Sequence, residues 1–156
     1  MTAAQPWRLS RPVRRVVARF AQIACPPEIR AGQRVDRTLA EFELMLGALQ
    51  PAARYALAAA FLAFDRGARL YPRSRRRRFT RLPDGAADAY LRALLARQDI
   101  LADVTRKLKS AVVICYYALP DVQQEIGYLP GPYIAAMTRR RLASYGDEIR
   151  RAEVDR

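Results

Sequence analysis

The segment from Ile100 to Leu119 repeats apolar residues every three or four positions, which is the period of one face of an α-helix. Asp99 directly precedes the first of these residues, at the place of a helix N-cap. The second half of the segment, AVVICYYAL, is apolar on almost every side, so we expect it at the centre of the core. This segment alone makes a helical protein the first expectation.

Other segments show the same period, and β-branched runs typical of strands are scarce. Helices are predicted from Pro12 to the Pro26-Pro27 pair, from Asp36 to Leu49, from Pro51 to before Pro72, from Asp84 onward, from Pro120 to Gly127, and from about Ile134. Residues 56–64 are apolar on all sides and are expected in a central position. We predict an all-α single-domain bundle of about six helices over residues 12–146, with a flexible N-terminus (1–11) and a charged tail (147–156).

The residues that usually carry catalysis are scarce. The chain has no histidine, and its two cysteines, Cys25 and Cys115, belong to no CxxC pair. Imidazole chemistry is therefore excluded, and two thiols alone do not hold a zinc ion or an iron–sulfur cluster. The sequence also has no Gly-rich phosphate loop and no GxSxG motif. We predict no catalytic, cofactor-binding or metal-binding residue, and no enzyme activity of the chain on its own.

Positive charge dominates the composition. The net charge is +13, and all but two of the 28 basic residues are arginine. The segment RSRRRRFTR, residues 73–81, contains no acid and should be exposed. Two uses remain open for it. The run could meet an acidic surface of a partner protein, or it could bind nucleic-acid phosphates while Phe79 stacks on a base. If the run meets a partner protein, the predicted partner-binding residues are Arg75, Arg76, Arg77 and Arg78.

The stretch YYALPDVQQEIGYLPGPY, residues 116–133, combines aromatic residues with prolines and glycines. Gly127 is expected to end a short helix, and LPGP is expected to form a stiff turn before the last helix. Rigid loops that bear tyrosines make good protein-binding surfaces, because tyrosine gives a large contact area at a low entropy cost. The predicted partner-binding residues here are Tyr117, Tyr128, Pro130, Gly131, Pro132 and Tyr133.

Three motifs carry a resemblance to a known family: YP followed by FTRL at 71–82, YLRALL at 90–95, and the ending IGYLPGP within residues 116–133. Together, over about residues 35–135, they resemble the small third subunit of gluconate 2-dehydrogenase-type complexes. The resemblance implies a helical accessory subunit that binds, stabilises or matures a large flavoprotein of the glucose-methanol-choline oxidoreductase superfamily. It also implies that FAD and the substrate pocket belong to the large subunit, and that this chain binds no cofactor.

The cellular location is a further expectation. Many members of that family carry a twin-arginine export signal. Here Arg14-Arg15 is followed by a segment that Arg19, Gln22 and two prolines interrupt, so export by such a signal is not predicted. No apolar run reaches the length of a membrane span. We expect a cytoplasmic protein, associated with a membrane only through a partner, with surface attachment by an amphipathic helix at 12–24 as an alternative.

Overall fold

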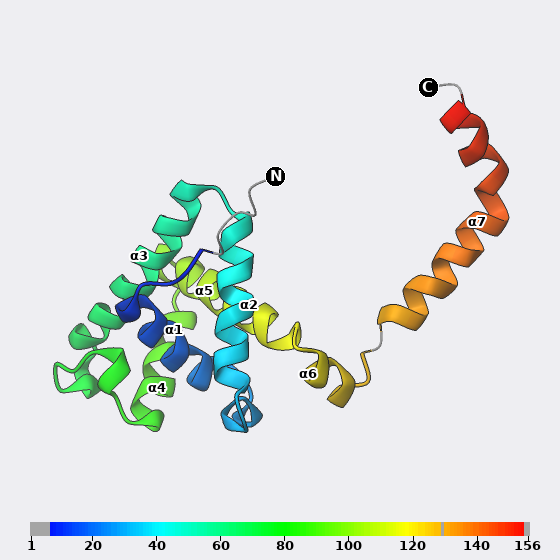
Figure 1. Ribbon diagram of the computed structural model, residues 1–156. Coiled ribbons are helices and arrows are strands. Elements are labelled where there is room, and N and C mark those ends of the chain that lie inside the picture. The colour runs from blue at the N-terminus through cyan, green and yellow to red at the C-terminus, as the bar shows by residue number, and fades with distance from the viewer. Residues whose placement is uncertain (1–6, 129, 155–156) are drawn as a thin grey trace. The chain divides into compact units, whose positions relative to one another are not determined.

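The computed structural model describes residues 7–128 and 130–154, and all regular structure in that part of the chain is helical (Figure 1). The predicted all-α fold is confirmed. Short 3₁₀ turns occupy residues 27–30, 68–70, 72–74 and 79–81. The α-helices are α1 (Arg11–Ala24), α2 (Arg34–Ala48), α3 (Pro51–Gly67), α4 (Asp84–Leu95), α5 (Ile100–Tyr117), α6 (Pro120–Glu125) and α7 (Pro130–Val154).

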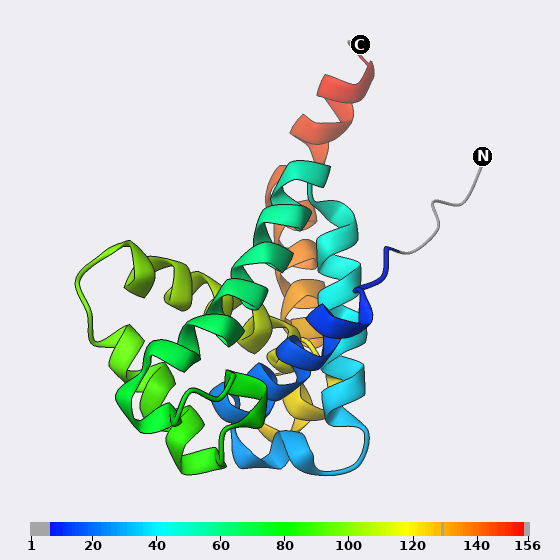
Figure 2. The ribbon, with the colours of Figure 1, turned by 90° about the vertical axis from the view of Figure 1, so that its left-hand side faces the viewer.

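Contacts divide the chain into two compact units, Met1–Leu119 and Pro120–Arg156. The first unit contains α1 to α5. Helix α1 lies between α2 and α3 in both views and also packs on α4 and α5 (Figures 1 and 2). Its buried residues recur at helical spacing, at Val13, Val16, Val17 and Phe20, as the sequence predicts. The second unit contains α6 and α7.

Aromatic rings form the centre of the first unit. Phe20 of α1 packs edge-on against Phe61 and Phe64 of α3, with ring centroids 5.4 and 5.0 Å apart. Phe42 of α2 and Phe79 extend the cluster to either side, at 5.7 Å from Phe61 and 4.8 Å from Phe64 respectively. Edge-to-face pairs of this kind add about 0.5–1.5 kcal/mol each beyond the burial of their area.

The predicted helix ends agree with local chemistry. The Asp99 side chain accepts a hydrogen bond from the backbone N–H of Ala102 at 3.1 Å, which confirms the N-cap of α5. Pro12 and Pro51 stand in the first turns of α1 and α3. Gly127 follows α6 with a φ of 71°, the left-handed conformation that glycine adopts without a steric cost.

The predicted central position of residues 56–64 is wrong in large part. Phe61 and Phe64 are buried, but Ala56, Ala59 and Ala63 are exposed, and Tyr55 just before them is 66% exposed. In α5, Val112, Cys115 and Tyr116 are buried as expected, whereas Ile114 faces outward. Both helices therefore show apolar side chains on their outer faces. Within the described residues, no helix combines the length and the apolar character that crossing a bilayer requires.

The last helix begins earlier than predicted. Helix α7 starts at Pro130, not at about Ile134, so Pro130, Gly131 and Pro132 belong to its first turn. Proline is tolerated there because the first N–H groups of a helix have no intrahelical partner. The predicted stiff LPGP turn is thus replaced by a helix start, and Leu129 lies outside the described residues. Residues 147–154 of the predicted tail continue α7.

The N-terminal segment is described only from residue 7, and 1–6 of the predicted flexible N-terminus lie outside that range. Leu9 is buried, and its backbone N–H donates to Glu43 of α2 at 3.1 Å. Arg14 of α1 donates to the same carboxylate at 3.1 Å and to Asp36 at 3.0 Å. These contacts fix the start of α1 against α2.

Candidate partner-binding site

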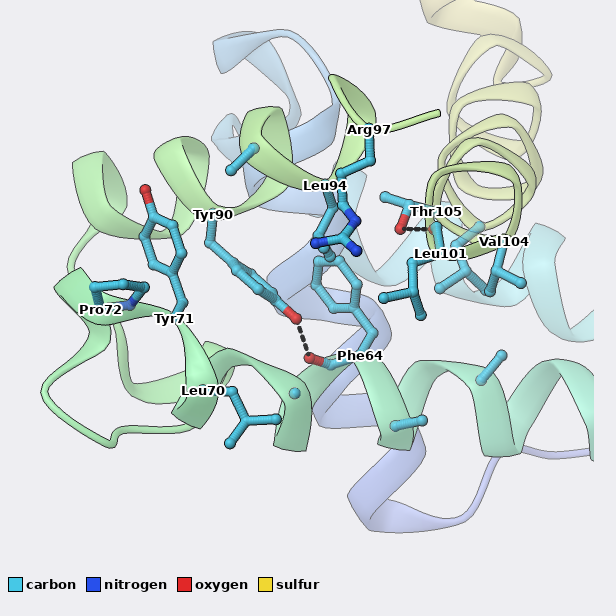
Figure 3. Close-up of a pocket in the computed structure, with 15 residues that line it drawn as sticks. Phe64, Leu70, Tyr71, Pro72, Tyr90, Leu94, Arg97, Leu101, Val104 and Thr105 are labelled. Atoms are coloured by element: carbon cyan, nitrogen blue, oxygen red, sulfur yellow. Dashed lines mark hydrogen bonds between the residues drawn. The ribbon is translucent and has the colours of Figure 1, made fainter. Parts of the chain in front are cut away.

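A cavity of about 560 Å³ lies in the first unit, among α3, α4, α5 and the turn that follows α3 (Figure 3). Small residues of α3, namely Ala60, Ala63 and Gly67, form one wall. Leu94 of α4 and Leu108 of α5 contribute to the opposite side. The volume lies within the range of pockets that hold a small molecule or several side chains of a partner.

Large apolar residues surround the opening. Leu70 is 88% exposed, Leu101 is 52% exposed, and Val104 is also exposed, and all three line the cavity. Ile100, next to Leu101, is exposed as well. Exposed apolar patches around a hollow are typical of interaction sites rather than of an ordinary protein surface.

Three polar side chains that line the cavity form hydrogen bonds within the chain. Tyr90 donates its hydroxyl hydrogen to the backbone carbonyl of Phe64 at 3.1 Å, as the dashed line in Figure 3 shows. Thr105 donates to the carbonyl of Leu101 at 2.6 Å. Arg97 extends toward the cavity from just beyond the end of α4, and its Nε donates to Asp99 at 2.7 Å.

These groups do not make a catalytic set. Burial, with the nearby Asp65 adding to it, raises the pKa of Tyr90 to about 12, so its phenol stays protonated near neutral pH. The Arg97 hydrogen bond lowers the pKa of Asp99 and holds it ionised. The residues that line the cavity include no carboxylate and no thiol. The cavity can therefore bind apolar groups, but it offers no nucleophile with a base.

The predicted partner residues of the arginine run are all exposed. Arg75, Arg76, Arg77 and Arg78 follow the short turn Pro72–Ser74. Ser74 is buried, and its hydroxyl accepts from the backbone N–H of Arg76 at 3.1 Å. Arg75 and Arg76 have φ values of 49° and 59°, which is rare for residues with a side chain. The buried residues Ser74, just before the run, and Phe79, just after it, are the anchors that hold this backbone.

Phe79 is one of those anchors. It is fully buried, and its ring lies 4.8 Å from that of Phe64. The prediction that Phe79 could stack on a nucleic-acid base is therefore wrong, because its ring belongs to the core. Next to it, Thr80 donates both its backbone N–H and its hydroxyl to Asp65, each at 2.9 Å.

The predicted tyrosine surface falls on two units. Tyr117 ends α5 in the first unit, where its ring contacts that of Tyr116 at 5.1 Å, and it is partly exposed. In the second unit, Tyr128 is 56% exposed and Tyr133 is 68% exposed, and Gly131 and Pro132 are exposed between them. Ile126 and Ile134 are also exposed, so apolar side chains flank both tyrosines.

The two cysteines are buried free thiols, as the sequence predicts for Cys115. Burial raises the pKa of Cys25 to about 12 and that of Cys115 to about 11. Both thiols are therefore protonated near neutral pH and unreactive. Across the residues that the structure describes, no cluster of acidic and cysteine side chains could hold a metal ion.

Comparisons with known proteins give no match: no protein-family model, no curated protein and no solved structure is similar to this chain.

Sequence reasoning did not identify the cavity. One indication was present, since Ala60, Ala63 and Gly67 repeat small residues every three or four positions of α3. Such a stripe marks a helix face that another segment approaches closely. The sequence does not say whether that segment belongs to the same chain or to a partner. The structure shows that α4 and α5 stand off from this stripe and leave a hollow.

Proposed function

We propose that this chain is a non-catalytic accessory subunit that binds and stabilises a large FAD-dependent dehydrogenase of the glucose-methanol-choline class. In this proposal the large subunit carries the FAD and the substrate pocket, and this chain binds no cofactor. A location in the cytoplasm, or at a membrane through the partner, belongs to the same proposal. The observation that carries it is the bare apolar surface of the second unit.

Helix α7 has 25 residues, and the side chains described in it, at positions 131–145, are all exposed. Several of them are large and apolar: Tyr133, Ile134, Met137, Leu142 and Tyr145. Most helical stability in proteins comes from packing an apolar face against another element. Within its own unit, α7 leaves these apolar side chains unpacked, and such a helix is suited to docking on a partner.

The first unit supports the same proposal. The apolar cavity and its exposed rim would accept apolar side chains of a partner, and burying Leu70 or Leu101 in this way would contribute about 1.5–3 kcal/mol each. Such burial needs no catalytic residue in this chain, in agreement with the protonated Tyr90 and the unreactive thiols.

The class of the partner rests on the motifs at 71–82, 90–95 and 116–133. Tyr71 and Pro72 of the first motif, and Tyr90 and Leu94 of the second, line the cavity. The third motif contributes the exposed Tyr128 and Tyr133 of the second unit. The residues of the three motifs thus include several that form the two apolar surfaces. They also include core residues such as Phe79.

The test is co-expression with the flavoprotein encoded in the same gene neighbourhood. The variant Tyr128→Ala with Tyr133→Ala should lower the yield of complex by at least tenfold, because two aromatic anchors are lost. Turnover per bound flavin should change little. A matched control, Leu44→Ala with Tyr55→Ala, removes side chains that are 69% and 66% exposed on α2 and α3, away from the cavity. It should assemble normally.

Three results would contradict the proposal. A purified wild-type complex without flavin absorbance would reject the flavoprotein partner. Normal assembly of the double tyrosine variant would reject the second unit as the interface. Full assembly with a large drop in turnover per flavin would instead give these tyrosines a catalytic role.

A further inference from the structure

Three arginines from separate elements line one small hollow of about 80 Å³ in the first unit. Arg15 comes from α1, Arg66 from α3, and Arg78 from the end of the arginine run. Thr80 and Asp65 also line it. The hollow is separate from the apolar cavity, with which it shares no lining residue.

None of these three arginines forms an ion pair within 4.0 Å in the described part of the chain, in contrast to their neighbours. On the same helix as Arg15, Arg14 pairs with Asp36 and Glu43, and Arg19 pairs with Asp84. The fold therefore supplies carboxylates to Arg14 and Arg19, and it leaves the three arginines that line the hollow without one.

The single acid at the hollow compensates only one of the three positive charges. Asp65 is 4% exposed, and its Oδ1 accepts both hydrogen bonds from Thr80 at 2.9 Å. Its role is to fasten the segment that carries Arg78. With three positive groups and one negative group lining the hollow, a net charge of about two positive units remains there.

The backbone around Arg78 is fixed rather than free to adapt. Phe79 is fully buried directly after it, and Thr80 is bonded to Asp65. Pro12 of the first turn of α1 also lines the hollow, and that turn carries no acidic side chain, so the helix end adds to the positive potential. The segment that carries Arg78 is thus anchored on α1 and α3, the two helices that carry Arg15 and Arg66.

We propose that this hollow binds a phosphate group in its dianionic form. The charge of a phosphate monoester near neutral pH matches the two uncompensated positive charges, whereas one carboxylate would match half of them. Guanidinium groups present paired N–H donors that fit phosphate oxygens bidentately. A hollow of about 80 Å³ has room for such a group but not for a nucleoside, since pockets for larger ligands begin near 300 Å³.

The phosphate could come from inorganic phosphate, from a soluble phosphomonoester or from the headgroup of a lipid. All three sources present a phosphate with at least three unesterified oxygens, which for a lipid means a phosphomonoester headgroup. This site does not depend on the proposed accessory function, because its residues are outside the second unit and the apolar cavity.

The experiment is calorimetric titration of the full chain with inorganic phosphate and with glycerol 3-phosphate, at constant ionic strength. The site variant Arg15→Gln, Arg66→Gln, Arg78→Gln should bind both at least tenfold more weakly than the wild type. The control variant Arg69→Gln, Arg73→Gln, Arg77→Gln changes the net charge equally, but none of its residues lines the hollow. It should retain wild-type affinity.

A second arm identifies the source. Vesicles of phosphatidylcholine, with and without phosphatidate, are tested for binding, and inorganic phosphate is added as competitor. Binding to phosphatidate vesicles that phosphate displaces, and that the site variant loses, supports the site with a lipid headgroup. Phosphate binding without any vesicle binding supports it with a soluble ligand.

Two outcomes would overturn the proposal. One is the absence of saturable one-to-one binding of both soluble phosphates to the wild-type chain. The other is an equal loss of affinity in the site and control variants, which would show attraction by overall charge. Circular dichroism of both triple variants checks that they are folded. If the triple site variant is unfolded, the single variant Arg15→Gln replaces it in the titration. The single variant should also bind phosphate more weakly than the wild type, and wild-type affinity would overturn the proposal.

Discussion

Replacing Gly67 with alanine tests how tightly Tyr90 is held at the wall of the apolar cavity. Gly67 ends α3 in the right-handed helical region, with φ −58° and ψ −28°, so an alanine fits its backbone. A Cβ added there would lie 3.1 Å from the Tyr90 hydroxyl oxygen. The hydroxyl would therefore have to shift, and it donates to the Phe64 carbonyl at 3.1 Å.

Two effects of similar size oppose each other in this variant. Alanine is favoured over glycine in a helix by about 0.5–1 kcal/mol. Weakening the Tyr90 hydrogen bond costs about 0.5–1.5 kcal/mol, so Gly67→Ala should change the free energy of unfolding by between about +0.5 and about −1 kcal/mol. In a Tyr90→Phe background the oxygen is gone, and the same change should stabilise by about 0.5–1 kcal/mol.

The assay is urea unfolding of all four members of the double-mutant cycle, followed by far-ultraviolet circular dichroism. The coupling between the two positions should be about 0.5–1.5 kcal/mol. Gly47→Ala is the matched control, because a Cβ at Gly47 of α2 would meet nothing within 4 Å. It should stabilise both backgrounds equally. A Gly67→Ala effect that is also the same in both backgrounds would refute the tight contact with Tyr90.

Two further predictions concern the core. Phe79→Ala should destabilise the chain by about 3–5 kcal/mol in urea unfolding, because the ring is fully buried against Phe64; a loss below about 1 kcal/mol would show that it does not anchor the arginine run. Cys25 and Cys115 have folded pKa values raised from 9.0 to about 12 and about 11, so their contribution to stability is present below pH 9 and is lost as pH rises toward 11–12. The double variant to alanine should therefore lose less stability than the wild type between pH 9 and 11 in thermal unfolding, and identical slopes would contradict this.

The sequence predicted the helices well, because their signals are local. The spacing of apolar residues gave α1 and α5, and the chemistry of Asp99 and Gly127 gave their places at helix ends. The start of α7 at Pro130 was missed for a physical reason: proline is compatible both with a turn and with the first turn of a helix. The sequence around it does not decide between these two conformations.

The candidate sites were less predictable, because they depend on contacts between distant segments. The exposure of the arginine run followed from its charge, but the convergence of Arg78 with Arg15 and Arg66 depends on how α1 and α3 pack. The apolar cavity likewise depends on where α4 and α5 stand relative to α3. Periodicity reports which face of a helix is apolar, and it does not report what covers that face.

Helix α3 shows why this distinction matters for function. Its exposed alanines, Ala56, Ala59 and Ala63, lose little transfer free energy in water, so the isolated chain can leave them bare at a small cost. The same small side chains allow another backbone to approach closely. Leu70, just after this helix, is large and exposed at the cavity, and it would contribute much more binding energy than the alanines if a partner covered it. The sequence assigns this apolar helix to the core, and the fold leaves it half exposed, which supports the proposal that a partner covers it.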